Sequence, residues 1–569
     1  MPEIILFFYR SVGKGRKMEL ISEYLERTWF ADYEDFKKNF TIKVPENFDF
    51  ARDVVDEWAR LEPDKRALIY CDDDDGNERV FTFQEISLLS KKAARYLTQL
   101  GVKKGDRIMT ILRRRWEYWI LAVAICRIGA LISPTAIQMT EKDLAYRINE
   151  CNAKVLIALE DDFVLEQIKN LKSKCPSLEH IALAGKTYKT GDDYLDFDRE
   201  FIDCSTLVGV SGLDNYDEMI IYFTSGTSGY PKMAIHNRIY PLGHIVTAKY
   251  MQCVQNDGLH LTQTDSGWAK FGWGNIYGQW ICGSAILAYD PVKFSPKALM
   301  EVIKKYAPTS ICIPPTMYRF LLHEGITSDH LKSVKWFSTA GEPLSGEVNK
   351  EIFNLTGLYI HEGFGQSEGT PITCSFQWLD VKPSSMGKPS PLYDVRIVRP
   401  DKTDCKEGET GEVVIFVKDK HDQLGLLDYY QFSGDKVDPV VDGVYHTGDT
   451  AFRDKDGYFW YVGRVDDMIK CSGYRIGPFE IESVLNTHPA VKESAIVGAP
   501  DPIRGQIVCA VIALRPGFEP SEDLTKELQA YVKKNTAPYK YPRKIVYVKE
   551  LPKTTTGKIV RNEAKKLVG

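Results

Sequence analysis

Two hydrophobic patterns alternate along most of the chain. From Val80 onwards, short apolar runs such as 107–112 alternate with longer segments in which apolar residues recur at helical spacing, as in 83–100 and 118–128. A second series of the same kind runs from Lys154 to about Phe376. Strands that alternate with helices are typical of parallel sheets covered by helices. The pattern therefore predicts two helix-covered α/β sheets.

The remaining segments carry other patterns. Residues 18–65 have apolar positions at helical spacing, and we expect helices that pack on the main body. Residues 382–461 are rich in Gly, Pro, Asp and β-branched side chains, which predicts a small antiparallel β-barrel. A short βαβ-like module follows. We therefore predict an α/β multidomain protein, with a large N-terminal domain over 1–465 that holds two α/β subdomains and the barrel, and a small α+β C-terminal domain over 466–569.

Length, charge and cysteine usage narrow the class of protein. A chain of 569 residues is too long for one core and suggests three or four folding units. The formal net charge of −5 leaves no broad cationic surface, so we expect no nucleic-acid partner. The 12 cysteines include no C-x-x-C pair, which fits a reducing compartment. The apolar start at 4–9 is too short for a signal peptide, and no run reaches the ~18 residues of a membrane span. We predict a cytoplasmic protein without a membrane span, whose oligomeric state stays open, a homodimer being one option.

The strongest candidate for chemistry is the loop after the apolar run 219–223. Its two glycines allow backbone N–H groups to face an anion, its hydroxyls are donors, and its lysine adds a charge. The Walker pattern G-x-x-x-x-G-K-[ST] is not met. Such a segment can also be a surface linker, but its place between a predicted strand and a Pro-Lys pair favours a phosphate loop. The predicted phosphate-binding residues are Thr224, Ser225, Gly226, Thr227, Ser228, Gly229 and Lys232.

Further motifs follow in order. They are GEPL at 341–344, GFGQSE at 363–368, YHTGD at 445–449, GR at 463–464, CSGYRIG at 471–477 and PKTTTGK at 552–558. Together with TSGTSGYPK at 224–232, this set resembles the adenylate-forming superfamily of acyl- and aryl-CoA synthetases, luciferases and peptide-synthetase adenylation domains. The segment 111–139 resembles medium-chain acyl-CoA synthetases most. The resemblance covers the chain from about residue 60 to its end.

The resemblance implies an ATP-dependent acyl-CoA synthetase. A carboxylic acid and ATP would form an acyl-adenylate and pyrophosphate, and CoA would then take the acyl group and release AMP. The implied cofactors and partners are ATP, Mg²⁺ and CoA together with a small carboxylic acid. Two alternatives stay open: an adenylating ligase with an acceptor other than CoA, and a catalytically silent nucleotide-binding protein.

The resemblance also implies roles for single residues. Phe364 would lie against adenine, Ser367 near the phosphates, and Glu368 would bind Mg²⁺, which prefers oxygen ligands. Asp449 would accept hydrogen bonds from the ribose hydroxyls, and Arg464 would lie near ribose or phosphate. The implied catalytic residues are Thr224, Glu368 and Lys558. The remaining implied nucleotide-binding residues are Gly341, Glu342, Pro343, Gly363, Gly365, Gln366, Arg475 and Lys558.

The small domain of this superfamily rotates between the two half-reactions. The matching hinge residue is Asp466, and one orientation would present Lys558 to the charge that develops at the α-phosphate. The other orientation would present the Gly473 loop to the thiol, because a residue without Cβ lets the pantetheine arm pass. The implied CoA-binding residues are Gly473, Tyr474 and Arg475.

The acyl site is implied by one comparison within the superfamily. Acetyl-CoA synthetases carry tryptophan where this chain has Gly365, so we expect a longer tunnel and short-to-medium-chain, branched or aryl acids. The predicted lining is Trp268, Phe271, Trp273, Gly274, Gly341 and Gly365. Trp268 and Trp273 can also be ordinary core residues. The run Arg113–Arg115 is open to two interpretations, an anion contact or surface charges.

Overall fold

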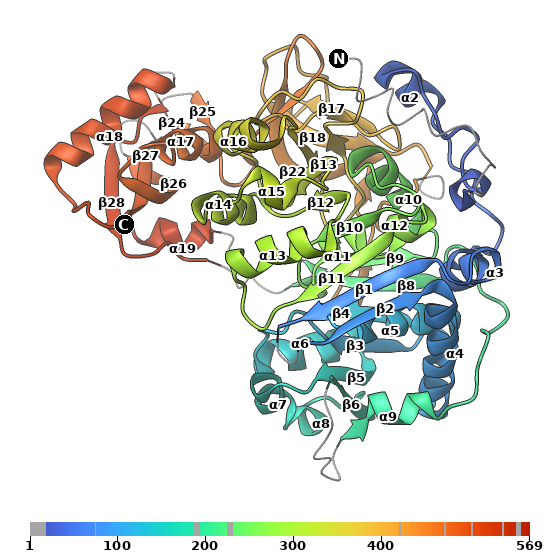
Figure 1. Cartoon of the computed structure of the whole chain (residues 1–569). Helices are drawn as coiled ribbons and strands as arrows, with labels where there is room; N and C mark the ends of the chain where they lie inside the picture. Colours follow the sequence, from blue (N-terminus) through green and yellow to red (C-terminus); the bar gives the residue numbers. More distant parts are fainter. Residues whose placement is uncertain are drawn as a thin grey trace.

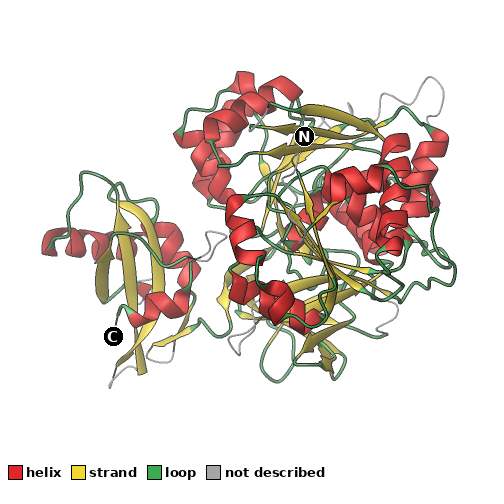
Figure 2. Ribbon diagram, turned by 90° about the horizontal axis from the view of Figure 1, so that it is seen from below, coloured by secondary structure: helices red, strands yellow, loops and turns green. Residues whose placement is uncertain are grey.

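The computed structural model describes residues 19–73, 76–185, 194–224, 231–419, 423–471, 474–501, 505–536, 540–553 and 559–568. Within these residues the strands form two nine-stranded and two five-stranded sheets. Three sheets belong to a large body, and the fourth forms a smaller unit at the C-terminal end, which stands beside that body in both views (Figures 1 and 2). The predicted fold class is confirmed, with a large α/β domain and a small domain that has its own sheet.

The first nine-stranded sheet carries the predicted phosphate loop. Its strand order is β20-β19-β9-β8-β4-β3-β5-β6-β7, with β3 to β8 parallel and β9 antiparallel to β8. The strands are β3 (Arg107–Ile111), β4 (Leu131–Pro134), β5 (Ala153–Leu159), β6 (His180–Ala184), β7 (Leu195–Asp196), β8 (Glu218–Thr224), β9 (Lys232–Asn237), β19 (Tyr429–Phe432) and β20 (Asp435–Val437). The associated helices are α5 (Glu117–Arg127), α6 (Glu141–Cys151), α7 (Asp162–Ile168), α8 (Leu171–Lys174) and α9 (Phe197–Ile202).

The second nine-stranded sheet carries two of the other predicted nucleotide loops, 341–344 and 363–368. Its order is β16-β15-β14-β13-β12-β10-β11-β1-β2. The strands are β1 (Arg66–Asp72), β2 (Glu78–Thr82), β10 (Leu259–Thr262), β11 (Ala285–Asp290), β12 (Ser310–Cys312), β13 (Trp336–Ala340), β14 (Ile360–Phe364), β15 (Thr373–Cys374) and β16 (Lys388–Pro389). Its chain segments also form α10 (Tyr240–Ile245), η3 (Val246–Met251), α11 (Ala269–Gly274), α12 (Tyr277–Ile281), α13 (Pro296–Tyr306), α14 (Pro315–His323), α15 (Ser328–Leu331) and α16 (Gly346–Thr356).

Several helices begin where the sequence supplies a side-chain cap. Helix α4 (Phe83–Gln99) starts after Thr82, whose hydroxyl accepts from the Glu85 backbone N–H, while the Glu85 carboxylate accepts from the Thr82 N–H. This reciprocal capping satisfies two N–H groups that a helix start leaves unpaired. Helix α4 then packs on α5, which is buried along its whole length. A helix that is buried all round needs apolar residues on every face.

The N-terminal helices are predicted correctly. They are η1 (Leu20–Glu23), α2 (Tyr33–Asn39), η2 (Phe50–Asp56) and α3 (Glu57–Leu61). Phe36 of α2 lies 4.6 Å from the Tyr250 ring centroid and 4.7 Å from that of Trp378. Aromatic rings bury large areas at such distances. This contact fixes the N-terminal segment on the large body.

A small antiparallel sheet lies at the position predicted for the barrel. It consists of β17 (Asp394–Val398), β18 (Gly411–Phe416), β21 (Val440–Val441), β22 (Val444–Arg453) and β23 (Phe459–Arg464). Strands β19 and β20 lie between β18 and β21 in sequence, yet they leave this sheet and extend the first large sheet through β9. Strand β19 therefore lies beside β9, the strand that follows the predicted phosphate loop.

The C-terminal unit is built on the fourth sheet. Its strands are β24 (Ile469–Cys471), β25 (Tyr474–Ile476), β26 (Val491–Asp501), β27 (Gly505–Leu514) and β28 (Lys544–Val548), and its helices are α17 (Pro478–Leu485), α18 (Glu522–Asn535) and α19 (Arg561–Lys566). Arg561 on α19 donates to Glu482 on α17 and lies 3.3 Å from the Asp467 carboxylate. These two ion pairs of Arg561 hold α19 against α17 and against Asp467, which lies at the start of the C-terminal unit.

The interpretation of Arg113–Arg115 as surface charges is wrong for two of the three residues. Arg113 and Arg115 are buried. Arg113 lies 3.1 Å from the carboxylate of Asp290, and Arg115 lies 2.9 Å from that of Glu117. Asp290 ends β11 in the second sheet, whereas Arg113 follows β3 in the first. Both pairs follow from the need of buried charges for opposite charges nearby, and the pair of Arg113 with Asp290 joins the two sheets.

Candidate active site

The two ends of the phosphate loop are held by a strand pair. Thr224, the last residue of β8, lies opposite Lys232, the first residue of β9. Residues 225–230 lie outside the described part of the chain, so the predicted contacts of Ser225, Gly226, Thr227, Ser228 and Gly229 are not placed. Successive residues of a strand alternate between its faces, and residues paired across an antiparallel ladder share a face. Tyr222, Thr224 and Lys232 therefore point to the same side of the sheet.

Glu368 lies on that side, close to the loop ends. The Tyr430 hydroxyl of β19 donates to the Glu368 carboxylate at 3.1 Å, and the Lys232 ammonium lies 5.3 Å from the centre of the Tyr430 ring. Burial raises the pKa of Glu368, while hydrogen bonds that include those from Tyr430 and Thr224 oppose the shift. The structure thus brings Thr224, Lys232 and Glu368 together, as the motifs predict.

A second group forms around Asp449. The Gln366 amide donates to the Asp449 carboxylate at 2.6 Å, the Tyr461 hydroxyl at 3.3 Å and the Arg464 guanidinium at 3.3 Å. Burial raises the pKa of Asp449 to about 6, and Arg464 opposes this shift most strongly. Because Gln366 belongs to the same loop as Glu368, its hydrogen bond links Asp449 of β22 to the loop that carries Glu368. Phe364 lies at the start of this loop, with its ring 6.2 Å from that of Tyr461.

The loop after β13 contains Gly341, Glu342 and Pro343. Gly341 has a φ of +99°, which favours glycine. The Glu342 carboxylate accepts from the Thr316 hydroxyl at 2.7 Å, and Lys270 of α11 donates to the carbonyl just before Gly341 at 2.7 Å. Since β13 and β14 are parallel neighbours, this loop and the 363–368 loop leave the same edge of the sheet. Ligands bind at such edges in open α/β sheets.

Glu362 is a buried carboxyl behind these loops. Burial raises its pKa to about 8, and a hydrogen bond from the Leu344 backbone N–H opposes the shift. The folded protein therefore retains a proton that the unfolded chain releases near pH 4.5. The contribution of Glu362 to stability is present at low pH and is lost as the pH rises towards about 8, by at most about 1.4 kcal/mol per pH unit.

We expect a Glu362→Gln variant to gain melting temperature relative to the wild type as the pH rises from 5 to 8. Glutamine keeps the acceptor for Leu344 but carries no charge to be buried. Thermal unfolding followed at several pH values measures the difference. Glu347→Gln on the exposed side of α16 is the matched control and should follow the wild-type profile. Parallel profiles for Glu362→Gln and wild type would show that Glu362 is not protonated in the folded state.

The predicted acyl residues separate into two groups. A Cβ atom built on Gly365 would lie 2.4 Å from the end of the Trp273 ring, so these two residues are in direct contact. Phe271 instead packs against Tyr118, with ring centres 4.7 Å apart, and a Cβ on Gly274 would collide with Thr262. Phe271 and Gly274 therefore lie on the core side of α11, while Trp273 faces the 363–368 loop. Trp268 is half-buried before α11.

Several predicted residues belong to the C-terminal unit. Gly473 and Lys558 lie outside the described residues, and only the backbone of Tyr474 and Arg475 is placed, in β25. Asp466 is exposed and lies 3.7 Å from the Arg464 guanidinium. The structure places this predicted hinge residue directly after β23, where the chain leaves the large body.

The described residues hold no group of three or more His, Cys, Asp or Glu side chains that could bind a metal by themselves. One carboxylate, Glu368, is nevertheless sufficient for Mg²⁺, because this ion is usually bound by one or two carboxylates together with substrate phosphates and water. Among the described helices, none combines the length and the apolar character needed to cross a bilayer.

Comparison with known proteins decides the family. The model of the AMP-binding enzyme family matches residues 55–417, and that of the AMP-binding enzyme C-terminal domain matches residues 480–558. The chain belongs to the AMP-binding enzyme family. The resemblance identified from the motifs is therefore confirmed.

The relatives of this AMP-binding enzyme include named acyl-CoA synthetases. It is 39% identical to human acyl-coenzyme A synthetase ACSM3, mitochondrial, over 94% of this chain and 92% of the relative. It is 37% identical to human acyl-coenzyme A synthetase ACSM4, mitochondrial, over 98% of this chain and 96% of the relative. Among solved structures, an anthranilate CoA ligase, AuaEII, in complex with anthranoyl-AMP has a TM-score of 0.82 at 27% identity, covering 92% of this chain and 98% of that one. The predicted acyl-CoA synthetase type is confirmed by these relatives.

The motifs did not identify several residues of this enzyme's site. Tyr430 reaches Glu368 from β19, and Tyr445 donates to the Gln366 amide oxygen at 2.8 Å. His236 on β9 is hydrogen-bonded to the Ser367 carbonyl at 2.8 Å, which fixes the loop from behind. Tyrosines in β-rich segments are common core residues, so the sequence carries no distinct signal for Tyr430 or Tyr445.

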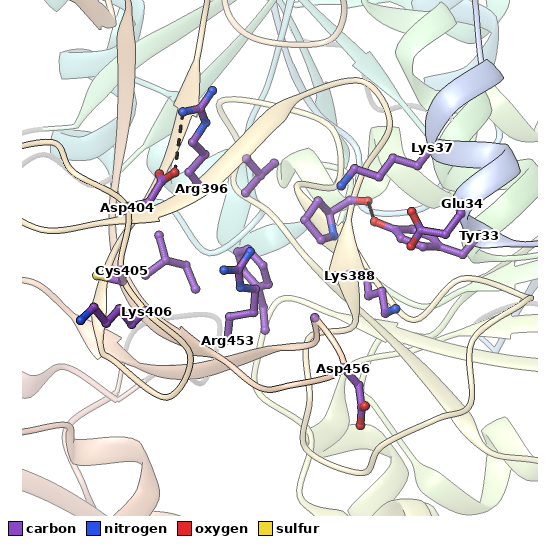
Figure 3. Close-up of a pocket in the computed structure, with 15 residues that line it drawn as sticks. Tyr33, Glu34, Lys37, Lys388, Arg396, Asp404, Cys405, Lys406, Arg453 and Asp456 are labelled. Atoms are coloured by element: carbon purple, nitrogen blue, oxygen red, sulfur yellow. Dashed lines mark hydrogen bonds and ion pairs between the residues drawn. The ribbon is translucent and has the colours of Figure 1, made fainter.

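A surface pocket of about 190 Å³ lies apart from these residues, between α2 and the small antiparallel sheet. Its rim carries Lys37, Lys388, Lys406 and Arg453 (Figure 3). None of the residues predicted for ATP, the acid or CoA lines it. We therefore do not assign this pocket to the reaction.

Proposed function

We propose that the protein joins carboxylic acids to CoA through an acyl-adenylate, with the nucleotide bound around the 363–368 loop. The observation that carries this proposal is that Thr224, Lys232 and Asp449 lie around the loop that holds Glu368, through contacts with Tyr430 and Gln366. These residues come from three separate motifs. A binding protein without catalysis would have no need for Lys558, to which the proposal assigns the charge that develops in the first half-reaction.

The first half-reaction is an in-line attack of the acid carboxylate on the α-phosphorus of ATP, with pyrophosphate leaving. Asp449 would hold the ribose hydroxyls, Phe364 would lie against adenine, and the 224–232 loop would hold the phosphates by backbone N–H groups and Lys232. Glu368 would hold Mg²⁺, which neutralises phosphate charge when bound. Lys558 would stabilise the charge that develops between carboxylate and α-phosphate.

In the second half-reaction, we propose that the C-terminal domain, residues 466–569, turns about Asp466. The exposed position of Asp466 directly after β23 is compatible with a change of backbone angles there. The Gly473 loop, with Tyr474 and Arg475, would then admit the pantetheine thiol, which attacks the acyl carbonyl and releases AMP.

For the acid, we propose a site behind the 363–368 loop, beside the contact of Gly365 with Trp273. Short-to-medium-chain, branched and aryl acids remain the proposed substrates. A Gly365→Trp variant should shift preference towards acetate or propionate, because even a Cβ at this position meets Trp273 and the larger ring must fill acyl space. Relative kcat/KM across a chain-length series measures the shift. Gly365→Ala should show a smaller shift of the same sign, and an unchanged acid profile in both variants would remove Gly365 from the acyl site.

Release of AMP tests the overall proposal. ATP, Mg²⁺ and each acid from acetate to dodecanoate, with branched and aryl members, are incubated with and without CoA. We expect AMP in turnover amounts only when CoA is present. AMP release without CoA dependence would indicate another acceptor, and no release with any acid would indicate a silent nucleotide-binding protein.

The compartment and the oligomeric state stay predictions. The sequence predicts a cytoplasmic protein, whereas the two human relatives are named as mitochondrial. Cell fractionation with an antibody against the full chain distinguishes the two compartments.

A further inference from the structure

Five buried polar side chains meet behind the 363–368 loop. They form what we call the interior polar cluster: Tyr222 of β8, His236 of β9, Tyr240 and His244 of α10, and Trp273 of α11. Each is at most 5% exposed. The ring centres of His236 and Tyr240 are 4.1 Å apart, those of Tyr240 and His244 4.6 Å, and those of His244 and Trp273 6.2 Å.

The two histidines of the interior polar cluster each leave one ring nitrogen without a hydrogen-bond partner among the described residues, namely Nδ1 of His236 and Nε2 of His244. The Tyr240 hydroxyl interacts with the Tyr222 hydroxyl and with Nε1 of Trp273, although these contacts fall short of good hydrogen-bond geometry. Folded proteins leave few buried polar atoms unpaired, because each costs about 1–3 kcal/mol. Two such nitrogens, on either side of a loosely bonded group of two tyrosines and a tryptophan, indicate a partner that comes from outside the chain.

The cluster lies where the acid must enter. Trp273 contacts Gly365, and His236 bonds to the Ser367 carbonyl, one residue before Glu368. Tyr222 and His236 share the face of the β8–β9 pair that also carries Thr224 and Lys232. The Tyr222 hydroxyl reaches α11, where a Cβ on Gly272 would lie 2.6 Å from it. An acyl group that extends from the α-phosphate into the protein therefore meets these atoms.

The chemistry of the cluster is that of neutral donors and acceptors. Burial lowers the pKa of His236 to about 4 and that of His244 to about 3, so both imidazoles are neutral at pH 7. Since the Ser367 carbonyl can only accept, Nε2 of His236 carries the proton and Nδ1 is an acceptor. Trp273 offers only a donor, and the tyrosines offer both. No cation is present in the cluster to pair with a second carboxylate.

We infer that the acid carries a neutral polar substituent, such as a hydroxyl group, that hydrogen-bonds within the interior polar cluster. This inference rests on the proposed function, because it assigns the substrate class of the same site. Plain alkanoates and benzoate would leave the two imidazole nitrogens unpaired or hydrated, and dicarboxylic acids would bury a charge without a partner. Both classes should be poorer substrates than a hydroxylated acid.

The test compares pairs of acids that differ by one hydroxyl group, in the complete reaction with ATP, Mg²⁺ and CoA. The hydroxyl group is placed at each position of the alkyl chain or the aromatic ring of the acid in turn. We expect kcat/KM for at least one hydroxylated acid to exceed that of its parent by roughly tenfold or more, as one additional buried hydrogen bond predicts. Parent acids that equal or exceed all of their hydroxylated partners would overturn the inference, and the cluster would then hold water. No thioester from any acid would instead contradict the proposed function.

A substitution within the interior polar cluster tests whether this cluster causes the preference for hydroxylated acids. Tyr240→Phe removes one hydroxyl from the centre of the cluster and should abolish the hydroxyl preference while changing the parent acid about threefold or less. Tyr250→Phe is the matched control, because its buried hydroxyl bonds to the Thr28 carbonyl at 3.3 Å, outside the cluster. Equal losses for hydroxylated and parent acids in Tyr240→Phe would contradict the inference. If Tyr240→Phe does not fold, the comparison of hydroxylated and parent acids with the wild-type enzyme tests the inference by itself.

Discussion

A Glu368→Gln variant is expected to form the acyl-adenylate roughly 10²- to 10³-fold more slowly than the wild type, as the loss of one group that stabilises transition-state charge predicts. Glutamine keeps the size of the side chain and the contact with Tyr430 at 3.1 Å. It removes the negative charge that would hold Mg²⁺ beside the phosphates. The change is therefore in charge and leaves the packing of the loop intact.

Pyrophosphate release in the first half-reaction measures the effect at several Mg²⁺ concentrations. High Mg²⁺ should restore part of the rate if the carboxylate acts through the ion. Tyr430→Phe is the companion variant, because it removes only the hydroxyl that orients Glu368 and should cost less. A Glu368→Gln enzyme with normal pyrophosphate release would exclude Glu368 from the metal site.

The Lys558→Ala variant is expected to lose acyl-adenylate formation by a similar factor and to retain most of the thioester step when the acyl-adenylate is supplied. The proposed lysine stabilises charge only in the adenylation orientation. The two half-reactions are measured separately, by pyrophosphate release and by thioester formation from synthetic acyl-adenylate. The ratio of the two losses is the diagnostic quantity.

Lys553→Ala is the matched control for Lys558→Ala. It lies five residues earlier in the same motif, and its ammonium is 2.5 Å from the Glu493 carboxylate within the C-terminal unit. Loss of this pair should affect stability more than either half-reaction. If Lys558→Ala lowered both half-reactions equally, the alternation of the C-terminal domain between two orientations would be contradicted.

The positions of the loops were predictable because local patterns determine them. The strand 219–223, the Gly- and Ser-rich loop after it, and the short motifs at 341–344 and 363–368 are contiguous in sequence. Strand propensity and turn residues act over such short distances. The carboxylates Glu368 and Asp449 could likewise be identified, because each stands in a motif that the superfamily shares.

The tertiary structure alone decided which segments share a sheet. Strands β1 and β2 join β10 to β16, and β19 and β20 join β9, although other strands intervene in sequence. Such pairings depend on which apolar faces are left to be covered once the chain has folded back on itself, and hydrophobic periodicity carries no information about that choice. The same reason explains why Arg113 meets Asp290 in the interior.

The sequence by itself determined the family, the order of the elements and the residues of the nucleotide motifs, because these are encoded within short stretches. Only the tertiary structure brought Tyr430 to Glu368, Trp273 to Gly365, and the interior polar cluster to the proposed acyl side of the loop. These contacts are made by groups that are distant in sequence and adjacent in space. The proposed site for the acid therefore depends on the packing of β8, β9, α10 and α11, and this packing is a property of the folded chain.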